Sequence, residues 1–168
     1  QAPRDPRKVT GWKFHSLYKA GWIMSLESLD VDQDGDQDVV VSDRKGSRRG
    51  VLWLENPGSA AAAAGKSWPE HRIGGTGLEV MFLAVADLDQ DGRQDIVTTT
   101  RNKKLLFLRR QSTDPIQWQS YAIENPHGIP NGKAVAVADM DGDGQLDMVH
   151  ATNTYGDRSY PGLVWMSY

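Results

Sequence analysis

The sequence predicts an all-β fold made of three similar antiparallel units, and three observations support this prediction. Short apolar and β-branched runs recur along the chain with turn residues between them, which is typical of strands. An aspartate-rich pattern occurs three times, each time between two such runs. No stretch shows the sustained 3.6-residue apolar period of an amphipathic helix. We therefore expect almost no helix.

Four strand-like runs are expected in each unit, and they follow one another in a fixed order. The first run is apolar or small and precedes an aspartate cluster; its copies are residues 22–26, 81–86 and 134–138. The second run is β-branched or apolar and follows the cluster; its copies are residues 39–41, 96–98 and 148–149. After a polar stretch comes the third run, with copies at residues 51–54, 105–108 and 163–166.

The fourth run has the form W-x-x-[HY]-x-[LI], and its copies are residues 12–17, 68–73 and 118–123. Its tryptophans are 56 and then 50 residues apart, and the alanine run at residues 60–64 accounts for the longer interval as an extended loop. A self-similar period of about 50 residues indicates a repeat protein. Four strands in each repeat are typical of a β-propeller blade.

The order of the runs predicts how the repeats are joined. The chain opens with a fourth-type run and closes with a third-type run. We therefore expect three four-stranded antiparallel propeller blades, in which the N-terminal run completes the last blade. The repeats are expected at about residues 12–67, 68–117 and 118–168. Residues 1–11 are rich in Pro, Arg and Lys and are expected to form a flexible arm.

Composition excludes several classes of protein. The chain has 168 residues, no cysteine, a formal net charge of −3 and 24% charged residues, which indicates a globular domain. The absence of cysteine excludes a disulfide framework, thiolate-ligated metals and a thiol nucleophile. No apolar run approaches the roughly 20 residues of a membrane helix. We expect neither a membrane span nor a nucleic-acid partner.

The aspartate clusters share the nine-residue pattern D-x-D-x-D-G-x-x-D and contain 13 of the 22 acidic residues. Ca²⁺ takes about six to eight oxygen ligands. Carboxylates at positions 1, 3, 5 and 9 and a backbone carbonyl at position 7 would supply them, while glycine at position 6 permits the turn. We therefore predict three Ca²⁺ sites, with these ligands: Asp30, Asp32, Asp34, Asp36, Asp38; Asp87, Asp89, Asp91, Arg93, Asp95; Asp139, Asp141, Asp143, Gln145, Asp147.

The aspartate clusters do not fit an EF-hand, and their charge indicates what the bound ions would do. An EF-hand would carry glutamate at position 12 between two helices, whereas position 12 here is Val41, Thr98 or His150 and the flanks are strand-like. Four neighbouring carboxylates repel one another strongly when no cation is present. We therefore expect calcium to stabilise the strands rather than to bind a ligand directly.

The clusters and their flanks, such as AVADLDQDGRQDIV and AVADMDGDGQLDMV, resemble FG-GAP or VCBS-type repeats over nearly the whole chain from Trp12 onward. The resemblance implies calcium-binding propeller blades, as in integrin α-subunit heads, some fungal lectins, polysaccharide lyases and many secreted bacterial proteins. Such propellers usually have about seven blades, and three blades cannot close a ring. The chain is therefore expected to be part of a longer chain or to self-associate, because open sheet edges favour aggregation.

The loops between the second and third runs are basic and are expected on the face opposite the aspartate clusters. Arginine pairs with carboxylates, sulfates and phosphates through two hydrogen bonds, so this face suits an anionic glycan or protein ligand. Solubilising hairpin tips are an equally good interpretation. The candidate ligand-binding residues are Arg44, Lys45, Arg48, Arg49, Arg101, Lys103, Lys104 and Arg158.

Catalytic residues stay unknown at this point, because no metalloprotease, hydrolase or dinucleotide motif is present. His150 could act as a general base, and Tyr155 and Arg158 follow it closely. The resemblance implies that lyases on this scaffold place His, Tyr and Arg in a groove, so these three residues are the candidates.

Three functions follow from these observations. We favour a non-enzymatic, calcium-stabilised module for binding or self-assembly, in an extracellular or periplasmic setting where calcium is abundant enough to fill weak loops. The second is a polysaccharide lyase or related carbohydrate-active enzyme. The third is a structural subunit of an extracellular filament.

Overall fold

A computed structural model describes residues 4–114, 116–154 and 156–167, and in these residues eleven strands form three antiparallel sheets. The first sheet has the order β1-β2-β3-β4, the second β5-β6-β7-β8 and the third β11-β10-β9. The strands are β1 (Ile23–Leu29), β2 (Asp38–Asp43), β3 (Gly50–Leu54), β4 (Glu70–Gly74), β5 (Val80–Ala86), β6 (Asp95–Thr100), β7 (Lys104–Thr113), β8 (Ile116–Glu124), β9 (Gly132–Ala138), β10 (Asp147–Thr152) and β11 (Leu163–Met166). The all-β prediction is confirmed.

Helix is nearly absent from the described residues, as expected. One turn of 3-10 helix, η1 (Val9–Gly11), precedes the sheets. The short helix α1 (Ser59–Ala63) occupies the alanine run between β3 and β4, where the sequence predicted an extended loop. Alanine has the highest intrinsic helix propensity, which explains this local difference. Neither helix in the described part of the chain is long and apolar enough to cross a membrane.

The three sheets repeat one register. In the first sheet Val40 pairs with Trp53, which pairs with His71. In the second sheet Val97, Phe107 and Tyr121 take the same positions. In the third sheet Val149 pairs with Trp165, and the described residues contain no fourth strand beyond it. Structurally equivalent residues can therefore be named across the repeats.

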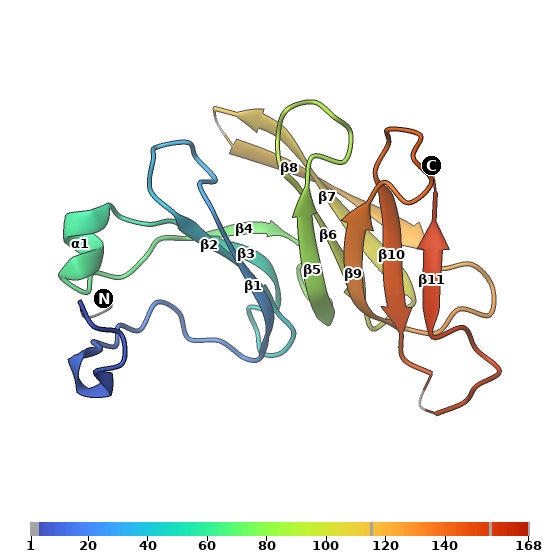
Figure 1. Cartoon of the computed structure of the whole chain (residues 1–168), viewed down its shortest axis with the longest axis horizontal. Coiled ribbons are helices and arrows are strands. Elements are labelled where there is room, and N and C mark those ends of the chain that lie inside the picture. Colours follow the sequence, from blue (N-terminus) through green and yellow to red (C-terminus); the bar gives the residue numbers. More distant parts are fainter. Residues whose placement is uncertain (1–3, 115, 155, 168) are drawn as a thin grey trace.

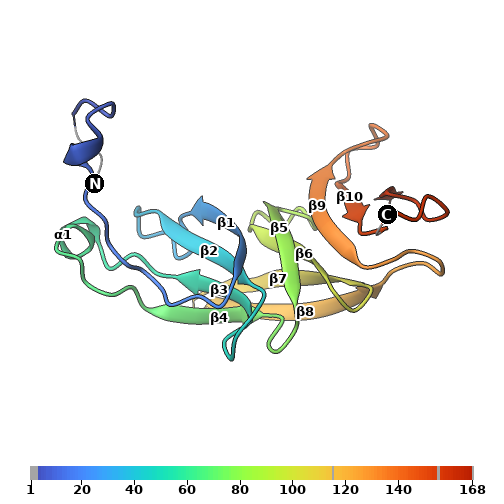
Figure 2. The same ribbon diagram turned by 90° about the horizontal axis from the view of Figure 1, so that it is seen from below.

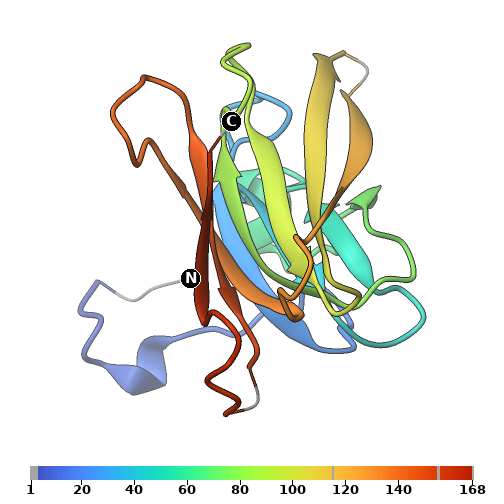
Figure 3. The same ribbon diagram turned by 90° about the vertical axis from the view of Figure 1, so that its right-hand side faces the viewer.

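Apolar side chains between successive sheets hold the molecule together. Figures 1 and 2 show the sheets as a row that begins near the N-terminus and ends at β11. One core joins the first two sheets and includes Trp53, Ile73 and Leu108. A second core, which includes Val97, Leu105 and Val135, joins the second and third sheets. Figure 3 views the molecule from the end of the row that carries the third sheet.

The N-terminal run does not complete the last sheet, so that expectation was wrong for this structure. Residues 12–20 form no strand, and Leu17 and Tyr18 pack against the first sheet. Asp43 fixes this arrangement, because its carboxylate accepts hydrogen bonds from the Gly21 and Trp22 backbone N–H groups, at 2.8 and 2.7 Å, and from the Tyr18 hydroxyl. The first and third sheets lie at opposite ends of the row, so the run cannot reach β11 of its own chain (Figure 1).

Candidate metal centres

The aspartate clusters form the β1–β2, β5–β6 and β9–β10 loops, which lie together at the upper end of the sheets in Figure 1. The β2–β3, β6–β7 and β10–β11 loops lie at the opposite end, as antiparallel topology requires. The predicted placement of acidic and basic loops on opposite faces is therefore confirmed.

Each aspartate loop is shaped by its own carboxylates. The position-1 carboxylate accepts hydrogen bonds from backbone N–H groups across the loop, for example Asp30 from Asp34 and Gly35 at 3.1 and 3.0 Å. The position-5 carboxylate accepts the position-7 N–H in all three loops, at 2.8, 3.0 and 2.8 Å. The position-6 glycines have φ between 85° and 94°, which side-chain-bearing residues rarely adopt. The predicted role of this glycine is confirmed.

The position-9 aspartates anchor the loops to the sheets. Asp38, Asp95 and Asp147 are 1%, 0% and 3% exposed. Each accepts a hydrogen bond from the position-2 N–H, at 3.0, 3.3 and 2.9 Å. Asp38 also accepts the Asn56 N–H beyond β3, and Asp95 accepts the Arg110 N–H in β7. A buried carboxylate that joins the loop to the third strand transmits the loop's conformation to the sheet.

Three carboxylates come together in each loop. One oxygen from each of positions 1, 3 and 9 lies within 4.8 Å of the others, which forms three triads: Asp30, Asp32, Asp38; Asp87, Asp89, Asp95; Asp139, Asp141, Asp147. The position-5 residues Asp34, Asp91 and Asp143 lie outside these triads, as do Asp36, Arg93 and Gln145 at position 7. The structure thus brings together three of the four predicted carboxylates in each loop.

The second loop differs from the others because two arginines enter it. The Arg109 guanidinium pairs with Asp89 and, at 3.1 Å, with Asp91, and Arg93 pairs with Asp91 as well. The pair with Asp89 raises the pKa of Arg109. Residues equivalent to Arg109 are Glu55 and Ser167, as the pairing of the third strands shows. The first loop is therefore the most negative of the three and the second the least.

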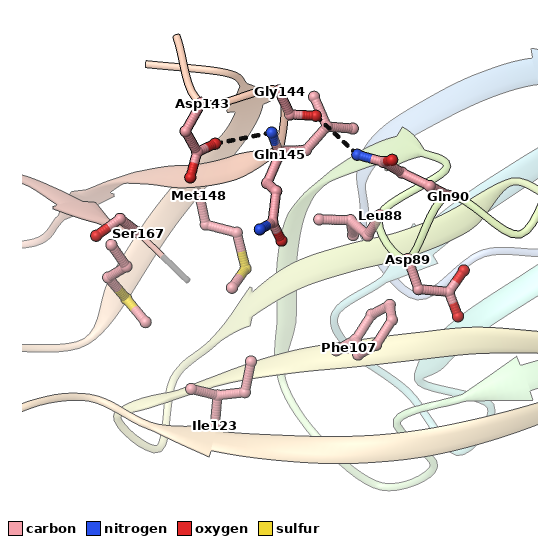
Figure 4. A pocket seen from close by; sticks show the side chains of 12 residues that line it. Leu88, Asp89, Gln90, Phe107, Ile123, Asp143, Gly144, Gln145, Met148 and Ser167 are labelled. Atoms are coloured by element: carbon pink, nitrogen blue, oxygen red, sulfur yellow. Dashed lines mark hydrogen bonds between the residues drawn. The ribbon is translucent and has the colours of Figure 1, made fainter. Parts of the chain in front are cut away.

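Neighbouring loops are also connected to one another. The buried Arg110 side chain reaches from β7 to donate a hydrogen bond to the Val31 carbonyl of the first loop. Its Nε has no hydrogen-bond partner, and burial lowers the pKa of its guanidinium. The Gln90 amide of the second loop donates to the Gly144 carbonyl of the third loop at 2.8 Å (Figure 4). The three loops thus form one connected row.

The donor set of each triad fits a hard divalent cation. All donors are carboxylate oxygens, which suit Ca²⁺ better than softer metals. Burial raises the pKa of Asp95 and of Asp32, and neighbouring carboxylates add to both shifts. A cation between the three oxygens would remove this repulsion. Residues at positions 1, 3 and 9 would hold the ion.

Many of the basic candidate residues already pair with acceptors within the chain. Glu79 pairs with Arg44 at 2.9 Å and with Lys45, and these two cations lower the pKa of Glu79, Lys45 most strongly. Three further candidates also contact acceptors within the chain: Arg48 pairs with Glu70, Lys104 pairs with Glu124, and Arg49 donates to the Gly77 carbonyl. Lys103 and Arg158 are exposed, and Arg101 is half-buried in the β6–β7 turn.

Two of the three candidate catalytic residues, His150 and Arg158, belong to the described part of the chain. His150 is fully buried in β10, and neither of its ring nitrogens has a hydrogen-bond partner. Burial lowers its pKa. Arg158 is exposed in the β10–β11 loop, and Tyr155 lies outside the described residues.

A pocket between the second and third sheets was not predicted (Figure 4). Phe107 and Ile123 line it from the second sheet, and Met148 and Met166 line it from the third. The aspartate loops close its upper end through Leu88 and Gln145. Sequence reasoning missed this pocket, and also Arg109 and Arg110, because their positions depend on how successive sheets pack. The repeat register could have placed Arg109 next to the second loop.

Comparison with known proteins agrees with the geometry of these loops. A family model described as an FG-GAP-like repeat matches residues 30–98 and 87–150. Each match begins at position 1 of an aspartate cluster, and together they cover more than half of the chain. No curated protein matches this chain.

Proposed function

We propose, from the premise that the chain belongs to the FG-GAP-like repeat family, that its three aspartate loops bind Ca²⁺ and that the ions stabilise a module for binding or self-assembly. The observation that carries this proposal is the repetition of one carboxylate triad, with oxygens within 4.8 Å, at the same place in all three sheets. Backbone hydrogen bonds account for the buried position-9 carboxylate of each triad, but they give no reason for positions 1 and 3 to direct two further carboxylates toward it.

Calcium stabilises the sheets through the position-9 aspartates. Each of these carboxylates is fixed by backbone N–H groups and at the same time belongs to a triad, for example Asp38 through Val31 and Asn56. An ion held by positions 1 and 3 as well therefore ties the tip of the loop to the ends of the second and third strands. Without the ion, the triad's repulsion opposes folding.

The setting we propose is extracellular or periplasmic. Calcium loops with few charged ligands bind in the range of about 0.1 to 1 mM, which external calcium can fill. A triad of three carboxylates in each loop would suit binding in this range.

Thermal unfolding in calcium and in excess EDTA tests this function. At about one hundred times the dissociation constant, one filled site adds about 2.7 kcal/mol. That gain raises the melting temperature of a domain this size by about 5 to 10 °C. Asp30→Asn and Asp139→Asn should each remove part of the calcium-dependent increase, whereas Glu27→Gln, an exposed change outside the loops, should leave it intact. An identical melting temperature in calcium and in EDTA would contradict the proposal.

A further inference from the structure

The outer face and edge of the third sheet are exposed, although the equivalent surfaces of the other sheets are covered. Leu163 is 67% exposed and Trp165 50% exposed. The equivalent residues Val51 and Trp53 of the first sheet are 0% and 5% exposed, because the second sheet packs over them. β11 is also the last strand of its sheet, whereas β3 and β7 pair with a fourth strand.

The fourth strands of the complete sheets define what would pair with β11. His71 of β4 pairs with Trp53 and stacks on it, with ring centroids 4.3 Å apart. Tyr121 of β8 pairs with Phe107 and stacks on it at 5.8 Å. The third member of this W-x-x-[HY]-x-[LI] series is the N-terminal run Trp12–Leu17, in which His15 takes the equivalent position. His15 and its neighbours form no strand.

The N-terminal run already lies where the fourth strand of a preceding sheet would lie. Ile73 of β4 packs in the core shared with the next sheet, and Ile123 of β8 does the same with Met148 and Met166. Leu17 is the equivalent residue, and it packs against the core of Val41, Leu52 and Leu54 in the first sheet. The run therefore lies against the first sheet in the way that β4 and β8 lie against the sheets that follow them. It differs from β4 and β8 because, in the described residues, no third strand of its own sheet pairs with it.

The space between the first and second sheets corresponds to the pocket between the second and third sheets, and a tryptophan side chain packs into it. Between the first and second sheets, Trp118 packs on the core that contains Trp53, Ile73 and Leu108. The equivalents of these three residues are Phe107, Ile123 and Met166, and all three line the pocket (Figure 4). The equivalent of Trp118 is Trp12, which is 43% exposed at the other end of the molecule.

We propose that residues 12–17 of a second copy of this chain add to β11 as a fourth antiparallel strand, with His15 opposite Trp165 and Trp12 in the pocket. The inference deepens the proposed function, since it names the partner of the module. The run cannot do this within one chain, because it lies beside the first sheet while β11 lies at the far end of the row (Figures 1 and 2).

The same contact places the exposed face of the third sheet against the first sheet of the second copy. Leu163 and Trp165 then meet the core of Val41, Leu52 and Leu54, as Val51 and Trp53 meet the second sheet within one chain. This contact joins different surfaces of the two copies. Such a contact closes into a ring when both copies make it, and otherwise extends head to tail.

Cross-linking tests the register directly, because the chain has no cysteine of its own. The pairs Leu52–Arg72 and Leu106–Ala122 predict that Ser16 lies opposite Val164. Two variants, Ser16→Cys and Val164→Cys, are mixed in saturating calcium and oxidised. A disulfide between the two chains is expected, since paired residues of neighbouring strands have the required separation. His15→Cys, whose side chain points to the other face, should cross-link to Val164→Cys at least several-fold less.

Mass in solution provides the second readout. Ser16→Pro removes a backbone donor from an exposed segment that forms no strand, so it should abolish association. It should leave the melting temperature unchanged at concentrations too low for association. The matched variant Ser16→Ala keeps the donor and should associate like the original chain. Trp12→Ala should weaken association at least tenfold. Sedimentation that shows a dimer or a longer series of copies supports the inference, whereas a monomer at high concentration, or equal cross-linking from both cysteine positions, overturns it.

These outcomes are independent of the calcium proposal. A monomer that calcium still stabilises would overturn the strand addition alone. Specific cross-linking with no effect of calcium on the melting temperature would overturn the calcium proposal and leave the strand addition supported.

Discussion

Arg109 and Arg93 distinguish the second aspartate loop from its neighbours at the scale of single residues. They pair with Asp89 and Asp91, so positive charge already occupies part of the space around this triad. At the same two positions the first repeat has Glu55 and Asp36, and the third has Ser167 and Gln145. The calcium proposal combined with these charges therefore predicts that calcium affinity is highest in the first loop and lowest in the second.

Replacing Arg109 by serine, the residue of the third repeat, should raise the calcium affinity of the second loop. Removing one partly exposed positive charge is expected to change the affinity by a few-fold to about tenfold. Calorimetric titration measures this in a background carrying Asp30→Asn and Asp139→Asn, which keeps the second triad intact.

The matched control for this prediction is Arg158→Ser, which removes the same charge from the opposite end of the sheets. It should leave the affinity of the second loop unchanged. Equal effects of the two substitutions would mean that net charge, rather than the ion pairs of Arg109, sets the affinity.

Burial of His150 predicts that stability depends on pH. Burial lowers its pKa in the folded state below the unfolded value of about 6.5, so the unfolded chain binds the proton more readily. The free energy of unfolding should therefore be highest above that pH and fall as the pH drops through and below it. His150→Val, which introduces the residue found at Val41, should flatten this dependence between pH 7.5 and 5.5.

Urea unfolding at the two pH values measures the effect, and the exposed His127 provides the control. His127→Val should keep the pH dependence of the original chain. If His150→Val loses stability on acidification as steeply as the original chain does, burial of this ring is not the cause.

At the scale of elements, the repeat pattern predicted the strands because each run has the period and residue types of a strand buried on at least one face. All eleven strands overlap a predicted run or its flank. The repeat pattern gave a wrong prediction for the N-terminal run, where packing between sheets decides whether a strand forms. The N-terminal run has the sequence of a fourth strand, yet strand pairing needs a third strand beside it, and the sheets of the described residues place none there.

The sequence likewise predicted the candidate site only where its residues are close together in the chain. Positions 1, 3 and 9 came together as predicted, because spacing within a nine-residue loop is local information. The arginines around the second loop come from β7 and from the loop itself, and only the register of the sheets brings Arg109 to Asp89. The pairing of the basic residues with Glu70, Glu79 and Glu124 is likewise tertiary.

Gly132 tests the contact between the second and third sheets. A Cβ at this position would lie 2.4 Å from the Thr99 Cβ in buried β6. Gly132→Ala should therefore push β9 away from β6 and lower the free energy of unfolding by about 1 to 3 kcal/mol. Denaturant unfolding measures this loss.

Gly162 is the matched control, because a Cβ there meets no atom within 4 Å and its φ is not positive. Gly162→Ala should change the free energy of unfolding by less than about 0.5 kcal/mol. Similar losses from the two substitutions would show that the close approach of Gly132 to Thr99 does not limit stability.

At the scale of the whole molecule, the aspartate loops form a connected row at one end of three packed sheets. Arg110 links the first loop to the second sheet, and Gln90 links the second loop to the third. An ion bound in one loop would therefore act on a neighbouring sheet as well as on its own. Under the calcium proposal, this arrangement would let small sheets with an exposed outer face gain stability from bound ions.

The most direct test is the number of calcium ions bound by each chain, measured by equilibrium dialysis at about 10 mM free calcium, roughly ten times the weakest dissociation constant expected for such loops. One ion in every carboxylate triad predicts three per chain, decreasing by one with Asp30→Asn or Asp139→Asn. A count near zero for the folded original chain, or a count that these substitutions leave unchanged, would contradict the claim that the aspartate loops are calcium sites.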